Sequence, residues 1–166
     1  MERNNGAKDL GGLTPLGGSQ DRPTTPATVL HIDDDPNDTE LLRAAVAQAE
    51  LKLQLQNVED GDRAMDYLRG RGVYSDRARF PAPDLILLDL QMPRATGLEV
   101  LQWIRRHSEL GAVPVVVLSG SEFGRDRDEA YAAGANSYIL KPLSLAGLVQ
   151  VVQQIWAQWL GCPAPA

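Results

Sequence analysis

The sequence indicates an α/β protein built around one parallel sheet that helices cover on both faces. Five short runs rich in β-branched residues or leucine have the character of strands, and runs such as LILL and VVVL are apolar at every position. Strands of that composition are buried on both faces. Segments with apolar residues at helical spacing separate these runs. Strands that alternate with helices form βαβ units, whose strands are parallel.

Each predicted element follows from its own local pattern. Strands are predicted at residues 28–32, 52–58, 85–88, 113–118 and 137–140. Helices are predicted at residues 38–49, 62–68, 98–107, 125–133 and 145–160. The last helix carries an apolar stripe that includes Trp156 and Trp159, as a helix packed against a sheet does. Gly70, Gly111 and Gly134 follow periodic segments, and glycine commonly ends helices.

Composition and charge exclude several classes of protein. A chain of 166 residues with 43% hydrophobic residues can bury a core without disulfides or metals. The net charge of −6 argues against a nucleic-acid partner, and the single Cys162 fits a reducing compartment. No apolar run approaches the roughly 20 residues of a membrane span. We therefore expect a cytoplasmic protein with neither a DNA nor a membrane partner.

The chain divides into three parts. Residues 1–26 contain Gly-Gly twice and three prolines with few large apolar residues, so we expect a flexible N-terminal arm. The regular pattern defines one domain over residues 27–161. Residues 162–166 are expected to form a short C-terminal tail.

Polar and charged residues follow four of the predicted strands. Asp33 and Asp34 follow the first strand, Asp89 the third, Ser119 ends the fourth, and Lys141 follows the fifth. The carboxyl ends of parallel strands share one edge of the sheet, where ligands bind. Carboxylates about 4 Å apart repel by about 4 kcal/mol at an effective dielectric near 20, so a cation is expected among them. An all-oxygen ligand set favours Mg²⁺, and with the lysine and the serine it could hold one phosphoryl group on Asp89.

Other interpretations of the acidic residues are available. Asp35, Asn37 and Asp38 precede or begin a predicted helix, and we interpret them as a cap and as charges favourable to the helix dipole. An EF-hand loop would require glycine at the position of Asp38. A phosphatase of the haloacid dehalogenase type would require a second aspartate where Gln91 stands. Neither alternative matches the sequence.

Four segments in order, VLHIDDDP, DLILLDLQMPRATGLEV, VPVVVLSGS and GANSYILKP, carry a resemblance to a known family. Over residues 28–160 the chain resembles the receiver domain of two-component response regulators. The resemblance implies a flavodoxin-like, doubly wound (βα)5 fold, with a five-stranded parallel sheet in the order 2-1-3-4-5. An extended last helix is also expected.

The resemblance also implies roles for the acidic residues. Asp89 would be the phospho-accepting aspartate. Asp34, Asp89 and the backbone carbonyl of Gln91 would ligate Mg²⁺ directly. Asp33 would act on the metal mainly through water.

Further residues gain implied roles in the phosphoryl site and its switch. Ser119 and Lys141 would bind the phosphoryl group, and Ser119 with Tyr138 would form the switch pair. The Lys141–Pro142 bond would be cis. His31 stands where the family commonly has an aliphatic residue, and we interpret it as a packed neutral imidazole.

A closer resemblance is to single-domain regulators paired with phytochrome-type histidine kinases. It rests on the stretched segment at 69–83 and on the long final helix that ends in aromatic residues. It implies a sensor histidine kinase partner, a bacteriophytochrome, and a homodimer through the last helix. With 25 residues after Lys141, no output domain is expected.

Three classes of function compete. A phospho-accepting signalling module agrees with the full set of aspartates, serine and lysine. It would not be a turnover enzyme, although Mg²⁺-dependent self-phosphorylation and autodephosphorylation are expected. A receiver-like interaction scaffold would usually lack one of these residues. A flavodoxin-like FMN binder would need a phosphate-binding loop where this chain has three aspartates.

Overall fold

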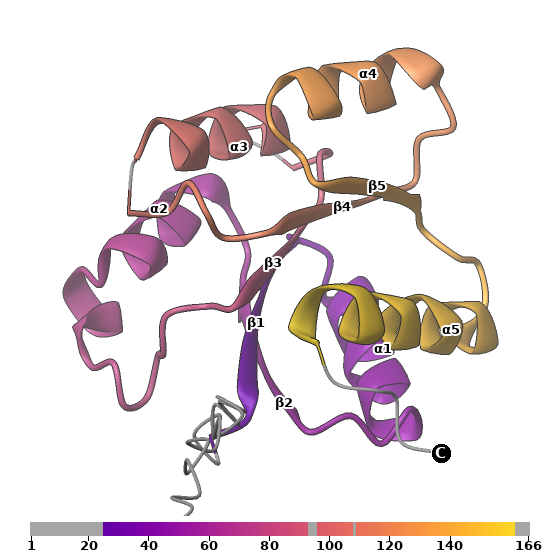
Figure 1. Cartoon of the computed structure of the whole chain (residues 1–166), viewed down its shortest axis with the longest axis horizontal. Coiled ribbons are helices and arrows are strands. Elements are labelled where there is room, and N and C mark those ends of the chain that lie inside the picture. Colours follow the sequence, from indigo (N-terminus) through magenta and orange to yellow (C-terminus); the bar gives the residue numbers. More distant parts are fainter. Residues whose placement is uncertain (1–24, 93–95, 108, 162–166) are drawn as a thin grey trace, which may run out of the picture.

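The computed structural model describes residues 25–92, 96–107 and 109–161. It contains a five-stranded parallel sheet in the order β2-β1-β3-β4-β5 (Figure 1). The predicted sheet, its order and the flavodoxin-like arrangement are therefore confirmed. Most of the predicted arm at residues 1–26 and the tail at 162–166 lie outside the described residues.

The elements agree with the predicted ones to within one or two residues. The strands are β1 (Ala27–Ile32), β2 (Leu53–Val58), β3 (Leu85–Leu88), β4 (Val115–Ser119) and β5 (Ser137–Leu140). The helices are α1 (Pro36–Gln48), α2 (Gly61–Arg69), α3 (Gly97–Arg106), α4 (Gly124–Ala132) and α5 (Leu145–Ile155). A 3₁₀ turn, η1 (Gly72–Ser75), follows α2, and a π-helical turn, η2 (Trp156–Leu160), extends α5. None of the helices described is long and apolar enough to cross a bilayer.

Alternating residues of the central strands face two separate cores. Val29 and Leu87 pack in the core that α1 and α5 cover. Leu30 and Leu88 pack in the core under α2 and α3. Figure 1 shows these two pairs of helices on opposite faces of the sheet. Side chains of successive strand residues point to opposite faces, so an entirely apolar strand fits between two helical layers.

Local signals decide where the helices begin and end. α1 begins directly after Asp35, whose carboxylate accepts a hydrogen bond from the Asn37 N–H at 2.8 Å. α2 ends at Gly70, whose φ of +66° lies in the left-handed region that favours glycine. α3 ends at Arg106, one residue before the predicted end at 107, and His107 then has an extended backbone, with φ −95° and ψ 112°. Gly111 lies further along the chain and is not the cap of this helix.

The stretched segment between α2 and β3 is held by one arginine. The Arg77 guanidinium donates hydrogen bonds to the backbone carbonyls of Tyr67 (2.8 Å), Leu68 (3.0 Å) and Phe80 (3.1 Å). The Tyr67 hydroxyl donates to the carbonyl of Pro81 at 2.7 Å. These bonds satisfy the last carbonyls of α2 and tie the segment to the domain.

Candidate functional site

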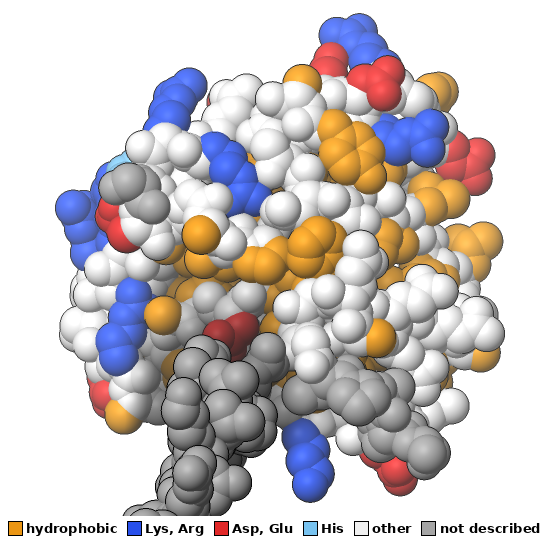
Figure 2. All heavy atoms as spheres, in the orientation of Figure 1, with side chains coloured by type: hydrophobic (Ala, Val, Ile, Leu, Met, Phe, Trp, Pro, Cys, Tyr) orange, Lys and Arg blue, Asp and Glu red, His pale blue; other side chains and the backbone are white. Residues whose placement is uncertain are grey.

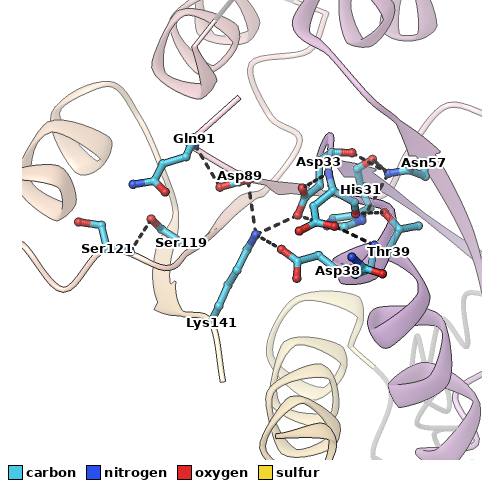
Figure 3. A network of polar contacts seen from close by, with 12 residues as sticks. His31, Asp33, Asp38, Thr39, Asn57, Asp89, Gln91, Ser119, Ser121 and Lys141 are labelled. Carbon is cyan, nitrogen blue, oxygen red and sulfur yellow. Dashed lines mark hydrogen bonds and ion pairs between the residues drawn. The ribbon is translucent and has the colours of Figure 1, made fainter. Parts of the chain in front are cut away.

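The predicted polar residues meet at the carboxyl edge of the sheet. Asp33 directly follows β1, Asp89 follows β3, Ser119 ends β4 and Lys141 follows β5. Figure 3 shows the lysine side chain extending toward both aspartates. The parallel strand order brings these four residues together from segments that are far apart in the chain.

The sheet itself positions the residues beyond its strand ends. The Asp89 N–H donates to the carbonyl of Ile32 at 3.0 Å, and the Lys141 N–H donates to the carbonyl of Ser119 at 2.8 Å. Asp89 and Lys141 are thus each the first residue after a strand and still bonded to the neighbouring strand. This pairing restricts the backbone and leaves only the side chains to adjust.

Three carboxylates form a cluster suited to a cation. Asp33, Asp34 and Asp89 each offer one oxygen, and these oxygens lie within 4.8 Å of one another. The side chains of Asp33 and Asp89 are buried, while Asp34 is exposed. Oxygen ligands suit hard divalent cations, and a cation would offset the repulsion among the buried charges. The residues present therefore fit a divalent metal.

Lys141 contacts three carboxylates. Its Nζ lies 2.9 Å from Asp33 Oδ2, 2.7 Å from Asp38 Oδ2 and 3.4 Å from Asp89 Oδ2 (Figure 3). Asp38 was expected only to favour the helix dipole, and its contact with the lysine is an addition. The sequence could have indicated this contact, because the predicted first helix begins just after the first strand and its first turn therefore lies beside the site.

The ion pairs shift the pKa values of the charged groups. Burial alone would raise the pKa of Asp33. Hydrogen bonds from His31, from the Asp35 N–H and from Lys141 outweigh burial and lower this pKa to about 2. Burial would lower the pKa of Lys141, but the surrounding carboxylates raise it above its usual range. Both groups are therefore charged at neutral pH.

Asp89 behaves in the opposite way. Burial raises its pKa, and the negative charge of Asp33 adds to this effect. The Gln91 N–H, which donates to Asp89 Oδ1 at 3.1 Å, and Lys141 oppose the rise without cancelling it. Among the buried carboxylates of the site, Asp89 is thus the one whose negative charge is compensated least. The hydrogen bond from the Gln91 N–H to Asp89 also places the Gln91 peptide beside this carboxylate.

The predicted switch residues are linked through Ser121. Ser119 is fully buried, and its Oγ accepts a hydrogen bond from the Ser121 N–H at 3.2 Å. The Tyr138 hydroxyl donates to the carbonyl of Ser121 at 2.9 Å. The Ser121 hydroxyl is hydrogen-bonded to the carboxylate of Asp126 at the start of α4. The loop between β4 and α4 therefore connects Ser119 to Tyr138.

The predicted cis bond before Pro142 is wrong. All peptide bonds of the described residues are trans, including Lys141–Pro142. The trans form of a bond before proline is favoured by about 0.5–1 kcal/mol. In this structure the Lys141 side chain reaches its three carboxylates from the trans backbone.

Gly97 is a positioning residue that sequence reasoning does not single out. It begins α3, and a Cβ atom there would lie 2.3 Å from the carbonyl oxygen of Asp89 and 2.6 Å from the Cα of Leu90. Its N–H donates to the Leu90 carbonyl at 3.2 Å. Only glycine lets α3 pack this closely on the backbone that carries Asp89. This glycine stands eight positions after Asp89 in the sequence.

The chain matches known proteins over most of its length. Residues 29–153 match the profile of the response regulator receiver domain. The chain belongs to this family. Curated relatives of this receiver include the probable methanogenesis regulatory protein FilR2 of Methanothrix harundinacea, 36% identical over 144 residues, which are 85% of this chain and 90% of the relative. Response regulator Rcp1 of Synechocystis is 34% identical over 140 residues, 84% of this chain and 93% of the relative.

Solved structures of other receivers have the same fold. Response regulator RPA3017 in red light signaling of R. palustris matches with a TM-score of 0.78 and 34% identity, over 84% of this chain and 99% of that one. The phosphorylated cyanobacterial phytochrome response regulator RcpA matches with a TM-score of 0.75 and 36% identity, over 85% and 99%. The Mn²⁺-bound form of Rcp1 matches with a TM-score of 0.72 and 34% identity, over 85% and 100%. This receiver is thus homologous to phytochrome response regulators, and its acidic cluster fits the divalent site of such proteins.

Proposed function

We propose that this receiver accepts a phosphoryl group on Asp89 from the phosphohistidine of a sensor histidine kinase. It then signals as a stand-alone response regulator, by conformational change or by passing the phosphoryl group on. The observation that carries the proposal is the placement of Lys141, whose Nζ lies 3.4 Å from Asp89 Oδ2. A lysine at this distance can neutralise charge on a phosphoryl group attached to that carboxylate.

In the proposed transfer, an oxygen of Asp89 attacks phosphorus as the bond from phosphorus to the kinase imidazole breaks. Asp34, Asp89 and the Gln91 carbonyl would hold Mg²⁺ directly, and Asp33 would do so through water. Bound Mg²⁺ supplies positive charge that offsets the charge on the phosphoryl oxygens. Self-phosphorylation by a small phosphodonor and later hydrolysis would use the same residues.

The hydroxyl of Ser119 connects this chemistry to the surface. It accepts a hydrogen bond from the Ser121 N–H, and new phosphoryl oxygens would attract its proton. A shift of Ser119 moves the Ser121 backbone, whose carbonyl holds the Tyr138 hydroxyl. The phosphoryl group would thereby bias a two-state arrangement of the β4–α4 loop and Tyr138.

The relatives support a phytochrome kinase as the partner. RcpA is described as a phytochrome response regulator, and another match, AtBRR, as a bacteriophytochrome response regulator at 32% identity and a TM-score of 0.67. We propose that this receiver is likewise phosphorylated by a bacteriophytochrome kinase, in the cytoplasm.

The last helix supports a homodimer through one of its two tryptophans. Trp156 is buried in the core and 8% exposed. Trp159 is only partly buried and lines a groove with Pro81 and Pro114. Figure 2 shows hydrophobic side chains gathered across the centre of the face that it draws. Trp159→Gln should lower the mass measured by light scattering to that of a monomer, whereas an unchanged dimer or a monomeric wild type contradicts the proposal.

Phosphate uptake tests the function directly. Wild-type protein incubated with acetyl phosphate and Mg²⁺ should gain one acid-labile phosphoryl group by mass spectrometry, and EDTA should prevent this. Asp89→Asn should take up none. Asp35→Asn is the matched control, since Asp35 is exposed and caps α1, and asparagine caps equally well. Wild-type uptake in Asp89→Asn contradicts the site, and uptake by no variant, wild type included, favours the interaction scaffold.

A further inference from the structure

His31 lies behind the acidic cluster in a defined orientation. It is 2% exposed, and its Nε2 lies 3.4 Å from Asp33 Oδ2 (Figure 3). Its Nδ1 lies 3.5 Å from the Nδ2 of Asn57, the residue paired with it on β2. The ring therefore stands between a carboxylate on one side and a side-chain amide on the other.

The Asp33 carboxylate indicates which ring nitrogen carries the proton, because an ionised carboxylate only accepts hydrogen bonds. The Nδ2 of Asn57 also donates to the carbonyl of His31 at 3.1 Å and to that of Asp33 at 3.4 Å. Its two hydrogens have those two carbonyls as partners, so Nδ1 at 3.5 Å can accept from the amide at most as a third, shared acceptor. An Nε2–H that points at the Asp33 carboxylate agrees with both contacts of the ring, and we take the neutral ring to carry its proton there.

Asp33 depends on donors that the reaction disturbs. Its side chain is fully buried, and its Oδ1 accepts from the Asp35 N–H at 2.9 Å. Its Oδ2 accepts from Lys141 at 2.9 Å. Lys141 is also the group that would engage a phosphoryl group on Asp89, and movement toward Asp89 draws it away from Asp33. The Nε2–H of His31 is the other side-chain donor that contacts this oxygen among the described residues.

We propose that His31 is a positioning residue for the acidic site. Its Nε2–H holds the Asp33 carboxylate in place and remains as its donor when Lys141 engages the phosphoryl group. The role rests on the proposed function, because Asp33 matters here as part of the Mg²⁺ site. An aliphatic residue at this position would donate no hydrogen bond, so the histidine adds a donor to the site.

Three substitutions separate a donor role from a packing role. Glutamine places its amide nitrogen the same number of bonds from the backbone as Nε2, so His31→Gln keeps a donor toward Asp33. Asparagine places its nitrogen at the level of Nδ1, and His31→Asn therefore falls short of Asp33. His31→Leu fills the space without a donor.

The decisive measurement is the affinity for Mg²⁺ by isothermal titration calorimetry, together with the free energy of unfolding without metal. His31→Leu and His31→Asn should bind Mg²⁺ about tenfold more weakly than wild type, the lower end of the effect usual for losing a hydrogen bond among the groups that surround a metal site. His31→Gln should bind close to wild type. The ring of the wild type should give the ¹⁵N signature of the Nε2–H tautomer in NMR spectra.

Each possible result supports or overturns either the role of His31 or the proposed function. Wild-type affinity in His31→Leu, a loss in His31→Gln equal to that in His31→Asn, or an Nδ1–H tautomer overturns the role. If His31→Leu does not fold, the glutamine and asparagine variants decide by their difference. A wild type that binds no Mg²⁺ and takes up no phosphate overturns the proposed function itself. A wild type that does both, with variants that match it, overturns only the role of His31.

Discussion

The Asp38 carboxylate lies 2.7 Å from the Nζ of Lys141, closer than the carboxylates of Asp33 (2.9 Å) and Asp89 (3.4 Å). Asp38 belongs to the first turn of α1, and its side chain is 37% exposed, whereas that of Asp33 is fully buried. The lysine is thus held by one accessible and two buried partners. Breaking a buried ion pair and breaking an accessible one should therefore change the free energy of unfolding by different amounts.

We predict that Lys141→Met lowers the free energy of unfolding by about 3 kcal/mol, because it leaves the buried Asp33 charge without its lysine partner. Asp38→Asn should cost less than about 1 kcal/mol, since a partly exposed ion pair contributes little. Urea denaturation in EDTA at pH 7 measures both values. Equal losses in the two variants would show that burial does not govern the strength of these pairs.

The pKa of Asp33 predicts how stability changes in acid. A carboxyl with a pKa of about 2 instead of 3.8 stabilises the folded state above pH 3.8, and this contribution is lost as pH falls through 2. The shift corresponds to about 2 kcal/mol. The difference in unfolding free energy between wild type and Asp33→Asn should therefore shrink by that amount between pH 5 and pH 2. A difference that stays constant with pH contradicts the assignment.

A side chain at position 97 should disturb the packing of α3 on the site. Gly97→Ala should lower the free energy of unfolding by about 3 kcal/mol, because its Cβ would overlap the backbone at Asp89. It should also weaken Mg²⁺ binding. Gly124→Ala is the matched control, since Gly124 also begins a helix but a Cβ there would meet no atom of the described residues within 4 Å, and its effect should stay within about 1 kcal/mol. Thermal and urea denaturation compare the two, and a neutral Gly97→Ala would contradict the close packing.

We expect Arg77 to stabilise the segment before β3. Arg77→Lys keeps the charge but loses the planar set of donors to three carbonyls, and we expect a loss of about 2 kcal/mol. Arg79→Lys is the control, because Arg79 is exposed and its guanidinium lies over the ring of Phe80, and its effect should be within about 0.5 kcal/mol. Limited proteolysis within 69–83 should become faster in Arg77→Lys alone. Similar proteolysis of both variants would contradict a locking role for Arg77.

Periodicity was enough to place the elements, but not all of their ends. The apolar strands and the amphipathic helices lie where their patterns predict. β4 begins at Val115 instead of residue 113 because Pro114 has no N–H for the ladder and the Val113 N–H closes a turn onto Leu110 at 3.1 Å. The end of α3 lies one residue before the predicted one, and the glycine that follows this segment, Gly111, does not cap the helix.

The residues of the site could be located from sequence because a topological rule applies to them. Parallel strands end at one edge, so Asp33, Asp89 and Lys141 had to meet there once the strands were recognised. Which carboxylate lies nearest the lysine, which groups face the two ring nitrogens of His31, and why position 97 must be glycine are visible only in the tertiary packing. Those features depend on how side chains and backbones of segments distant in the chain meet in space, and local sequence patterns carry no information about such contacts.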